Sequence, residues 1–296
     1  MVDCVLIVIS YRTATEVALL LATIPDAVGS LTWRVLVVDN DGDEDLRSGI
    51  VGQPQAEVLD AGANLGYAGG INLALRKAPA SRWTVFLNPD LRLAPGAIER
   101  MASEAGDDRA ICPAIVDARG VRQHSVRREP TLLGAVGDAA FGARWAGRPT
   151  ALSETVRTAD TYSRATAIDW ATGAALLVPT DVVRTVGEWD AERFFLYSEE
   201  TDYCRRIRRA GHEIRFLPGA VVMHGGGGSG QSSSLFALKE VNRVRYFRKW
   251  HGAGQTTAFA AVVLLANLLR ATHPRSRAAV RALMSPVARR ALPGAP

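Results

Sequence analysis

The 296-residue chain is poor in cysteine, and this scarcity excludes small domains that are held together by zinc or by disulfide bonds. Its three cysteines, Cys4, Cys112 and Cys204, are widely spaced and odd in number. No CxxC pair offers zinc its usual thiolate ligands, and no even set of cysteines predicts a disulfide framework. With 48% hydrophobic residues, the chain can instead build a large core. We therefore expect a globular protein of a reducing compartment, the cytoplasm.

Long apolar runs are also lacking. The N-terminal segment Val2–Ser10 is apolar but short and has no basic lead, so it predicts a buried strand rather than a signal peptide. The longest apolar run, residues 258–269, is interrupted by Asn267 and is too short to span a bilayer. The sequence thus predicts no segment that crosses a membrane.

The charge balance is moderately basic and uneven. The formal net charge is +5, with an arginine cluster at residues 205–209 and an excess of basic residues from Arg243 onward. Such an excess suits phosphate groups, an anionic membrane surface or nucleic acid. No known nucleic-acid-binding motif or interleaved aromatic platform accompanies it, so we expect no nucleic-acid partner.

Strand and helix patterns alternate in the first ninety residues. Apolar runs typical of strands buried on both faces lie at 5–9, 34–38, 56–60 and 83–87. Helical patterns lie between them at 15–24 and 69–78. This alternation predicts βαβ units and a parallel sheet, with functional residues at the carboxyl ends of its strands.

The second half is less regular. Residues 112–165 predict loops with a short strand or helix, and a strand is expected within 168–179. Further on we expect a helix at 200–210, short strands at 212–216 and 220–223, and a helix at 235–250.

Two segments suit a nucleotide. Asp39 follows the second predicted strand, where its carboxylate would accept a hydrogen bond from a base or ribose; in an Asp-Asn pair it equally suits a plain turn. The stretch NLGYAGGIN, from Asn64 to Asn72, places small residues ahead of a helix, so its backbone would approach a phosphate or sugar closely. It is neither a dinucleotide fingerprint nor a P-loop, and a glycine-rich connection is the alternative.

Two further segments suit a metal ion and proton transfer. Asp90 ends the strand in FLNPD, and a divalent cation that bridges to a diphosphate needs only one or two protein ligands. Three carboxylates, Glu199, Glu200 and Asp202, stand together in FFLYSEETDYCRR, where they would also complement the dipole of a helix start. His224 precedes four glycines and suits a metal, a phosphate or a structural role.

The order and spacing of these segments resemble the inverting family 2 glycosyltransferases of the GT-A fold, in particular their bacterial rhamnosyltransferase-like branch. The resemblance spans roughly residues 3–250. Its motifs are a strand leading to Ser-Tyr, VVDN, NxGYAGGxN, FLNPD, WATGAALLVP and FFLYSEETDYCRRIRRAGHEIRFLPGAVVMHGGGGS. It implies an α/β fold with a mostly parallel, Rossmann-like central sheet flanked by helices, in a domain at residues 1–250. A helical basic and apolar extension would follow at 251–296.

For the donor, the resemblance implies a nucleotide-diphosphate sugar and a divalent cation, Mg²⁺ or Mn²⁺. The residues placed near nucleotide and sugar are Ser10, Tyr11, Asp39, Asn64, Gly66, Asn72, Asn88 and Asp90. Asn88 and Asp90 match the metal-binding DxD signature, with Asn in its first position. The cation would therefore be held by Asp90, the diphosphate and His224. The donor implied first is dTDP-rhamnose or a similar deoxyhexose, with UDP sugars as the alternative.

For the acceptor, the resemblance implies a glycan, a lipid-linked glycan or a small molecule, as in cell-wall or polysaccharide biosynthesis. The family's acceptor-side motif matches Trp170, Thr172, Gly173 and Ala174. The stretch KEVNRVRYFRKWHG and the Arg-rich apolar tail would suit peripheral contact with the inner face of the cell membrane. Helix packing on the domain itself, or on a second subunit in a homodimer, is the alternative.

Glu200 stands where the family carries its catalytic base, which is usually Asp. This base takes a proton from an acceptor hydroxyl as its oxygen attacks the anomeric carbon opposite the leaving diphosphate. Glu reaches further by a methylene, so either the backbone is set back, or Glu199 is the base and Glu200 supports it. A GT-A protein that binds a nucleotide sugar or a scaffold partner without turnover is the third alternative. An NAD-dependent oxidoreductase is disfavoured because no GxGxxG follows the first strand.

Overall fold

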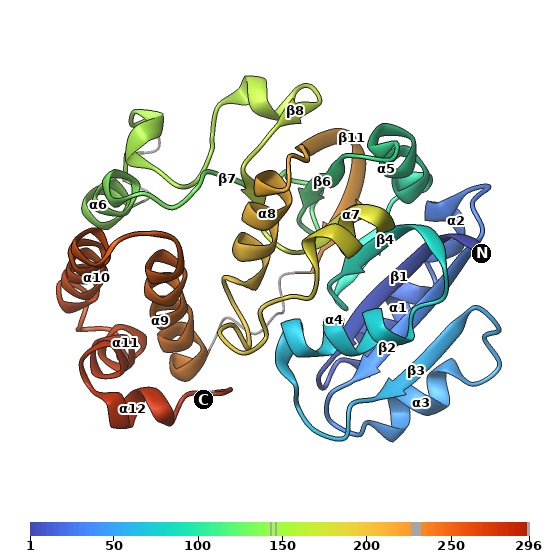
Figure 1. Ribbon diagram of the computed structural model, residues 1–296, viewed down its shortest axis with the longest axis horizontal. Coiled ribbons are helices and arrows are strands. Elements are labelled where there is room, and N and C mark those ends of the chain that lie inside the picture. Colours follow the sequence, from blue (N-terminus) through green and yellow to red (C-terminus); the bar gives the residue numbers. More distant parts are fainter. Residues whose placement is uncertain (143, 146, 226–231, 295–296) are drawn as a thin grey trace.

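The computed structural model describes residues 1–142, 144–145, 147–225 and 232–294, which form a mixed sheet with a helical layer beside it (Figure 1). The first half contains β1 (Val2–Ser10), α1 (Ala14–Leu21), α2 (Ile24–Val28), β2 (Trp33–Asp39), α3 (Glu44–Ile50), β3 (Ala56–Asp60), α4 (Gly66–Lys77), β4 (Ser81–Leu87), β5 (Leu91–Leu93), α5 (Ala97–Ala105) and β6 (Ala110–Val116). The second half contains β7 (Val126–Arg127), α6 (Leu132–Phe141), β8 (Thr166–Ala167), β9 (Trp170–Ala171), β10 (Ala175–Pro179), α7 (Thr180–Val186), α8 (Glu199–Arg209), β11 (Ile214–His224), α9 (Ser233–Trp250), α10 (Ala253–Leu268), α11 (Pro274–Met284) and α12 (Pro286–Arg290). Two short 3₁₀ helices, Thr150–Leu152 and Ala159–Tyr162, lie between α6 and β8.

The main sheet follows the order β3-β2-β1-β4-β10-β6-β11-β5, and β8 pairs with β11. Its first four strands are parallel, as the alternation of strands and helices predicts. Beyond them the sheet is mixed, because β10 runs antiparallel to both β4 and β6, and β5 runs antiparallel to β11. The α/β fold with a central sheet and flanking helices is therefore confirmed, and its parallel part is the N-terminal half.

The apolar run of β1 is continuous because both faces of the strand are covered. Leu6 and Val8 belong to a core on one side of the sheet, and Val5 and Ile7 belong to a second core on the other side. Successive side chains of a strand point to opposite faces, so each core receives every second residue. This burial of β1 on both faces fixes the central position of the strand in the sheet.

Several predicted elements differ from the observed ones. The helix expected at 15–24 is two helices, because α1 ends at Leu21 and α2 begins at Ile24. The two short strands expected at 212–216 and 220–223 are one strand, β11, with an irregularity in its pairing to β6 between Leu217 and Val221. Residues 112–165, expected to hold loops with a short strand or helix, hold more than this, namely most of β6, all of β7 and α6, and both 3₁₀ helices.

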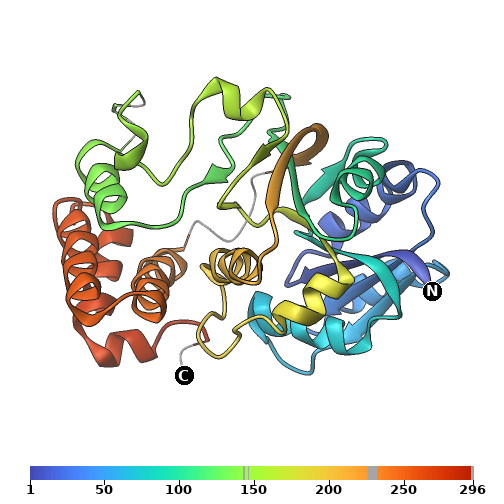
Figure 2. The same ribbon diagram turned by 45° about the horizontal axis from the view of Figure 1, so that its top comes forward.

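The last three helices pack into a helical layer with α6 and α9 (Figure 1). Phe247 of α9 stacks on Phe259 of α10 with ring centroids 4.1 Å apart, and Ala135 of α6 belongs to the same core. Asn267, which interrupts the apolar run of α10, is buried and donates a hydrogen bond of 2.9 Å to Glu240. Figure 2 shows α8 between this layer and the sheet. Among the helices described, none is both long and apolar enough to cross a membrane.

Candidate active site

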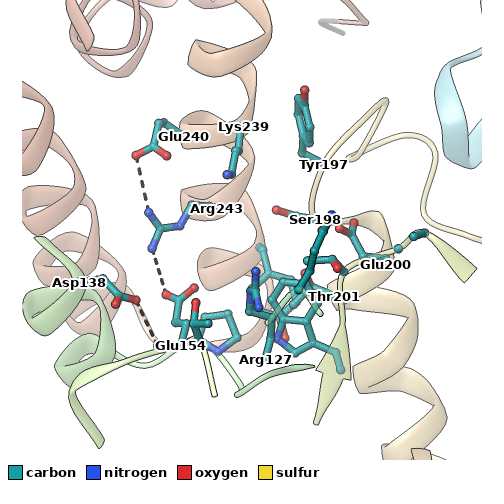
Figure 3. A pocket seen from close by; sticks show the side chains of 18 of the residues that line it. Arg127, Asp138, Glu154, Tyr197, Ser198, Glu200, Thr201, Lys239, Glu240 and Arg243 are labelled. Atoms are coloured by element: carbon teal, nitrogen blue, oxygen red, sulfur yellow. Dashed lines mark hydrogen bonds and ion pairs between the residues drawn. The ribbon is translucent and has the colours of Figure 1, made fainter. Parts of the chain in front are cut away.

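A cavity of about 570 Å³ lies between the start of α8, the inner face of α9 and the segment from β7 to β9 (Figure 3). We call it the α8–α9 cavity. The sheet side contributes Asn88, Ile115, Gln123, Trp170, Thr172, Gly173, Ala174 and His224. The helices contribute Asp138, Glu200, Thr201, Lys239, Glu240, Arg243, Tyr246 and Phe259. Strand β7 contributes Arg127, and the connections contribute Pro130, Glu154, Thr155, Tyr197 and Ser198. Of the residues predicted as catalytic, only Glu200 lines it.

The backbone turns sharply just before Glu200. Tyr197 and Ser198 both have φ of +70°, the left-handed region that non-glycine residues rarely adopt. Each such residue costs about 1–3 kcal/mol, so surrounding contacts must hold the turn. Asn242 of α9 provides two of them, because its side-chain amide donates hydrogen bonds to the carbonyls of Leu196 (2.9 Å) and Tyr197 (3.3 Å). The first turn of α8, and Glu200 with it, is thereby positioned from α9.

Glu199 and Glu200 are neighbouring carboxylates, of which Glu199 is buried and Glu200 is partly buried. Burial, and then the charge of Glu200, raises the pKa of Glu199 well above its usual range, and burial also raises the pKa of Glu200. Within the described part of the chain, one oxygen of each carboxylate is buried and receives no hydrogen bond. A carboxylate with these properties at a cavity wall suits a proton acceptor. The geometry favours Glu200 for that role over Glu199, which lies outside the lining.

Gly173 leaves the room that the longer Glu200 side chain needs. A Cβ atom at position 173 would lie 3.3 Å from both Cβ and Cγ of Glu200, which is tighter than an ordinary carbon contact. The other predicted acceptor-side residues, Trp170, Thr172 and Ala174, line the same cavity, and Trp170 Nε1 donates a hydrogen bond of 2.8 Å to the Arg128 carbonyl. The structure thus brings the whole predicted acceptor motif together with Glu200.

Asp202, the third carboxylate of the cluster, does not line the α8–α9 cavity. It is fully buried, and its oxygens lie 2.7 Å from Lys249 Nζ, 3.0 Å from Arg206 Nε and 2.9 Å from Trp250 Nε1. These contacts join α8 to the last turn of α9, so the role of Asp202 is structural.

Asp90 and His224 meet where β11 pairs with β5. His224 Nε2 lies 3.4 Å from Asp90 Oδ1, while Asp90 Oδ2 is buried and has no hydrogen-bond partner in the described residues. Asn88, the first residue of the Asn-Pro-Asp triplet, lies in the cavity wall, and its N–H donates to the Ala174 carbonyl (2.8 Å). The described residues contain no set of three or more side chains that would enclose a metal ion. The Asp90 carboxylate nevertheless fits Mg²⁺ or Mn²⁺, which prefer oxygen ligands and keep positions for water and phosphate oxygens, and the His224 imidazole beside it is a softer second ligand.

Of the two roles considered for Asp39, nucleotide contact or turn formation, the structure shows the turn. Its carboxylate accepts hydrogen bonds from the N–H groups of Asp41 (3.1 Å), Gly42 (2.9 Å) and Asp43 (3.0 Å), and it pairs with Arg47 at 3.1 Å. Burial alone would raise the pKa of Asp39, but these donors outweigh it and hold the pKa below its usual range. Contact between Asp39 and a nucleotide base stays a prediction.

The glycine-rich segment is tied to both neighbouring motifs. Gly66 has a φ of +72°, and a Cβ there would lie 2.2 Å from the Phe195 carbonyl, so only glycine fits. Asn40 Nδ2 donates to the Gly66 carbonyl (3.0 Å), and the Asn64 side chain accepts from Gly66 N–H (3.0 Å). The segment therefore connects the end of β2 to the chain just before α8.

The remaining predicted donor residues lie outside the α8–α9 cavity. Ser10 is buried with its hydroxyl 2.9 Å from that of Thr13, whereas Tyr11 is 44% exposed. Asn72 is buried, and its amide exchanges two 2.8 Å hydrogen bonds with the backbone of Trp189. This pairing gives Asn72 a structural role, and its place in a donor site stays a prediction.

Sequence reasoning missed the contribution of α9. Lys239, Asn242, Arg243 and Tyr246 follow the spacing i, i+3, i+4, i+7, which marks one face of a helix. That spacing could have identified an inward polar face. The sequence left two alternatives for KEVNRVRYFRKWHG, peripheral membrane contact or packing on the domain or a second subunit. The inward residues pack within the domain, where the cavity and the contacts of α8 engage them, and membrane contact stays a prediction.

Comparisons with known proteins agree with this geometry. The profile of glycosyl transferase family 2 matches residues 5–177. The N-acetylglucosaminyl-diphospho-decaprenol L-rhamnosyltransferase of Mycobacterium tuberculosis is 28% identical over 204 residues, which cover 64% of this chain and 66%, just under two thirds, of that relative.

Two solved structures share the fold. The mannosyltransferase PcManGT from Pyrobaculum calidifontis, in complex with GDP-Man and Mn²⁺, superposes with a TM-score of 0.56 at 14% identity, over 97% of this chain and 82% of that one. GalNAc-T7 with UDP, GalNAc and Mn²⁺ gives 0.57 at 12% identity, over 84% and 48%. The fold is thus GT-A, and the chain belongs to glycosyl transferase family 2.

Proposed function

We propose that the protein is an inverting glycosyltransferase that moves a sugar from a nucleotide diphosphate to an acceptor hydroxyl. The observation that carries the proposal is the position of Glu200, whose partly buried carboxylate lines the α8–α9 cavity beside Thr172 and Gly173. The similarity to an L-rhamnosyltransferase makes a deoxyhexose such as rhamnose the first donor to test, as dTDP-rhamnose, with UDP sugars next.

In this proposal Glu200 accepts the proton of the acceptor hydroxyl during a single in-line displacement, which inverts the anomeric centre. Its raised pKa keeps it a stronger base than an ordinary glutamate once ionised. Asp90 and His224 would hold the divalent cation, which when bound offsets the charge of the leaving diphosphate. Asn88 would line the path between cation and acceptor.

Product release tests the function. Nucleoside diphosphate is measured with dTDP-rhamnose and UDP sugars, with and without Mg²⁺ or Mn²⁺, in the presence of glycan and lipid-linked acceptors. Glu200→Gln should lower turnover about 10²–10⁴-fold, the usual contribution of a general base, and leave nucleotide affinity unchanged. Glu199→Gln is the matched control. Full turnover in Glu200→Gln would remove Glu200 as the base.

The alternative function, a nucleotide-sugar-binding protein without turnover, makes a different forecast. Calorimetry would then show nucleotide binding in the wild type, but no nucleoside diphosphate would appear with any acceptor. Asp90→Ala separates the metal assignment from both functions. It should weaken binding of the nucleoside diphosphate only when Mg²⁺ or Mn²⁺ is present, and equal metal dependence in wild type and variant would exclude Asp90 as a ligand.

The proposal extends to the membrane through the C-terminal helices. Residues 241–296 contain ten Lys and Arg and no Asp or Glu. The exposed large apolar residues of this segment are Leu265, Leu268, Leu269, Met284 and Val287. Exposed apolar side chains among arginines are typical of peripheral contact with anionic lipid. We propose that the extension 251–296 brings the catalytic domain, residues 1–250, to the cytoplasmic face of the membrane, where a lipid-linked acceptor lies.

A further inference from the structure

Two cationic side chains in the α8–α9 cavity have no acidic partner. Lys239 enters from α9 and Arg127 from β7, on different walls (Figure 3). Arg127 donates only to the backbone carbonyls of His124 and Val126 (3.1 Å for the latter). Within residues 1–142, 144–145, 147–225 and 232–294, no carboxylate lies within ion-pair distance of either side chain. The third cation of the cavity, Arg243, differs, because it pairs with Glu154 at 3.0 Å and Glu240 at 3.6 Å.

The carboxylates of the cavity are already engaged elsewhere. Asp138 pairs with the buried Arg148, Glu154 with Arg243, and Glu240 with both Arg243 and Asn267. Glu200 is the remaining acid in the wall. Burial raises its pKa, and the charges of Lys239 and Arg127 act in the opposite direction, so both cations lie within electrostatic reach of the proposed base. The acids of the cavity therefore do not balance these two cations by contact.

An unpaired cation in a partly enclosed cavity favours an anionic ligand. Burying a charge without a partner is unfavourable, and this cost applies to Arg127, which is partly buried and whose pKa is lowered by burial. Lys239 is exposed and adds a second positive charge to the cavity lining. A phosphate supplies both the missing charge and acceptor oxygens for Lys and Arg. A neutral sugar would leave both cations unpaired.

The position of Arg127 assigns the anion to the acceptor. Arg127 pairs in register with Trp170 in the two-stranded sheet of β7 and β9, so it lies beside the acceptor-side motif. In the proposed function the donor diphosphate would instead be bound through the cation held by Asp90 and His224, whose side chains lie 3.4 Å apart. Building on the proposed function, we propose that Arg127 and Lys239 form a subsite for a phosphate or diphosphate carried by the acceptor. The acceptor is then a phosphorylated sugar rather than a neutral glycan.

Binding of inorganic pyrophosphate in EDTA tests the subsite without turnover. Calorimetry is run on wild type, Lys239→Met and Arg127→Met, with Lys77→Met and Arg128→Met as controls that remove the same charge outside the cavity. We expect each cavity variant to bind pyrophosphate about 10-fold more weakly, as loss of a charge-assisted hydrogen bond would give, and the controls to match wild type. Lys239 is exposed, so its variant should fold; Arg127→Lys retains the charge and should retain most of the affinity.

A second measurement separates acceptor from donor. The affinity for dTDP with Mn²⁺ should stay within about twofold of wild type in Lys239→Met and Arg127→Met. If dTDP affinity falls while pyrophosphate binding in EDTA persists, the cations serve the donor and the proposal is wrong. Absence of pyrophosphate binding in wild type, or equal binding in all variants, also overturns it. None of these outcomes depends on Glu200, whose failure as a base would appear only in the turnover of Glu200→Gln.

Discussion

Replacing Gly173 with alanine would press a methyl group against the proposed base. The new Cβ would lie 3.3 Å from Cβ and Cγ of Glu200, whereas carbon atoms are in favourable contact at about 3.5–4.0 Å. Glu200 would therefore move by about 0.2–0.7 Å. Because a displacement of about 1 Å in a reacting group can cost about 10²-fold in rate, we expect kcat to fall about 3- to 25-fold.

The assay for Gly173→Ala is release of nucleoside diphosphate at saturating donor and acceptor, beside calorimetry with the nucleotide alone. Nucleotide affinity should not change, because position 173 lies on the acceptor side. Gly254→Ala on α10 is the matched control, since a Cβ there meets no atom within 4 Å. An unchanged kcat in a folded Gly173→Ala variant would show that Glu200 does not need its present position, and the argument for it as base would fail.

Three other changes test the surroundings of the site. Glu199→Gln should make Tm fall less steeply as pH rises above about 4.3, the pKa of a glutamate in the unfolded chain. In the wild type, the raised pKa of Glu199 makes the folded state lose stability between about pH 4.3 and that raised pKa. Asp202→Asn should lower the free energy of unfolding by about 1.5–3 kcal/mol in urea, because Arg206 loses its charged partner and Lys249 keeps only Asp190. Leu269→Glu combined with Val287→Glu should reduce co-sedimentation with anionic liposomes several-fold, since both side chains are 75% exposed.

The controls for these three changes are equally specific. A wild-type Tm that does not fall with pH would contradict the raised pKa of Glu199. A loss below about 1 kcal/mol in Asp202→Asn would show that the α8–α9 contact resembles a surface ion pair. Val121→Glu, at a 57% exposed site outside the C-terminal helices, controls for the liposome experiment. Equal recovery of all proteins would rule out the C-terminal surface as the membrane contact, and a concentration-dependent dimer would favour a second subunit instead.

The N-terminal, parallel half of the sheet could be predicted because its signals are local. The run of β1 shows burial on both faces by itself, and Glu200, Thr172 and Gly173 belong to segments whose spacing was recognisable. What could not be predicted were contacts between distant segments. Whether the Asp39 carboxylate contacts a nucleotide base or its own turn depends on the N–H groups of the loop that follows it. The presence of Asn267 in an apolar helix is explained only by its hydrogen bond to Glu240, 27 residues away.

The same limit explains α9. Its sequence carries basic and aromatic residues that suit a membrane surface and a buried helix equally well. Only the packing of α10 and α11 against it decides which face is inward. In that packing, Lys239 lines the cavity and Asn242 contacts the turn before Glu200. The exposed apolar side chains are those on the outer side of the last helices.

The two hydrogen bonds from Asn242 to the turn before α8 also bear on how this protein could be engineered. Because α9 fixes the carbonyls of Leu196 and Tyr197, the position of Glu200 depends on α9 as well as on α8. A chimera designed to exchange the proposed donor specificity should therefore cross over near Pro179, at the end of β10, and carry α8 through α11 as one piece. A crossover between α8 and α9 would pair Glu200 with a helix from another protein, and cutting the chain after Trp250 would disturb Glu200 although every proposed site residue remained.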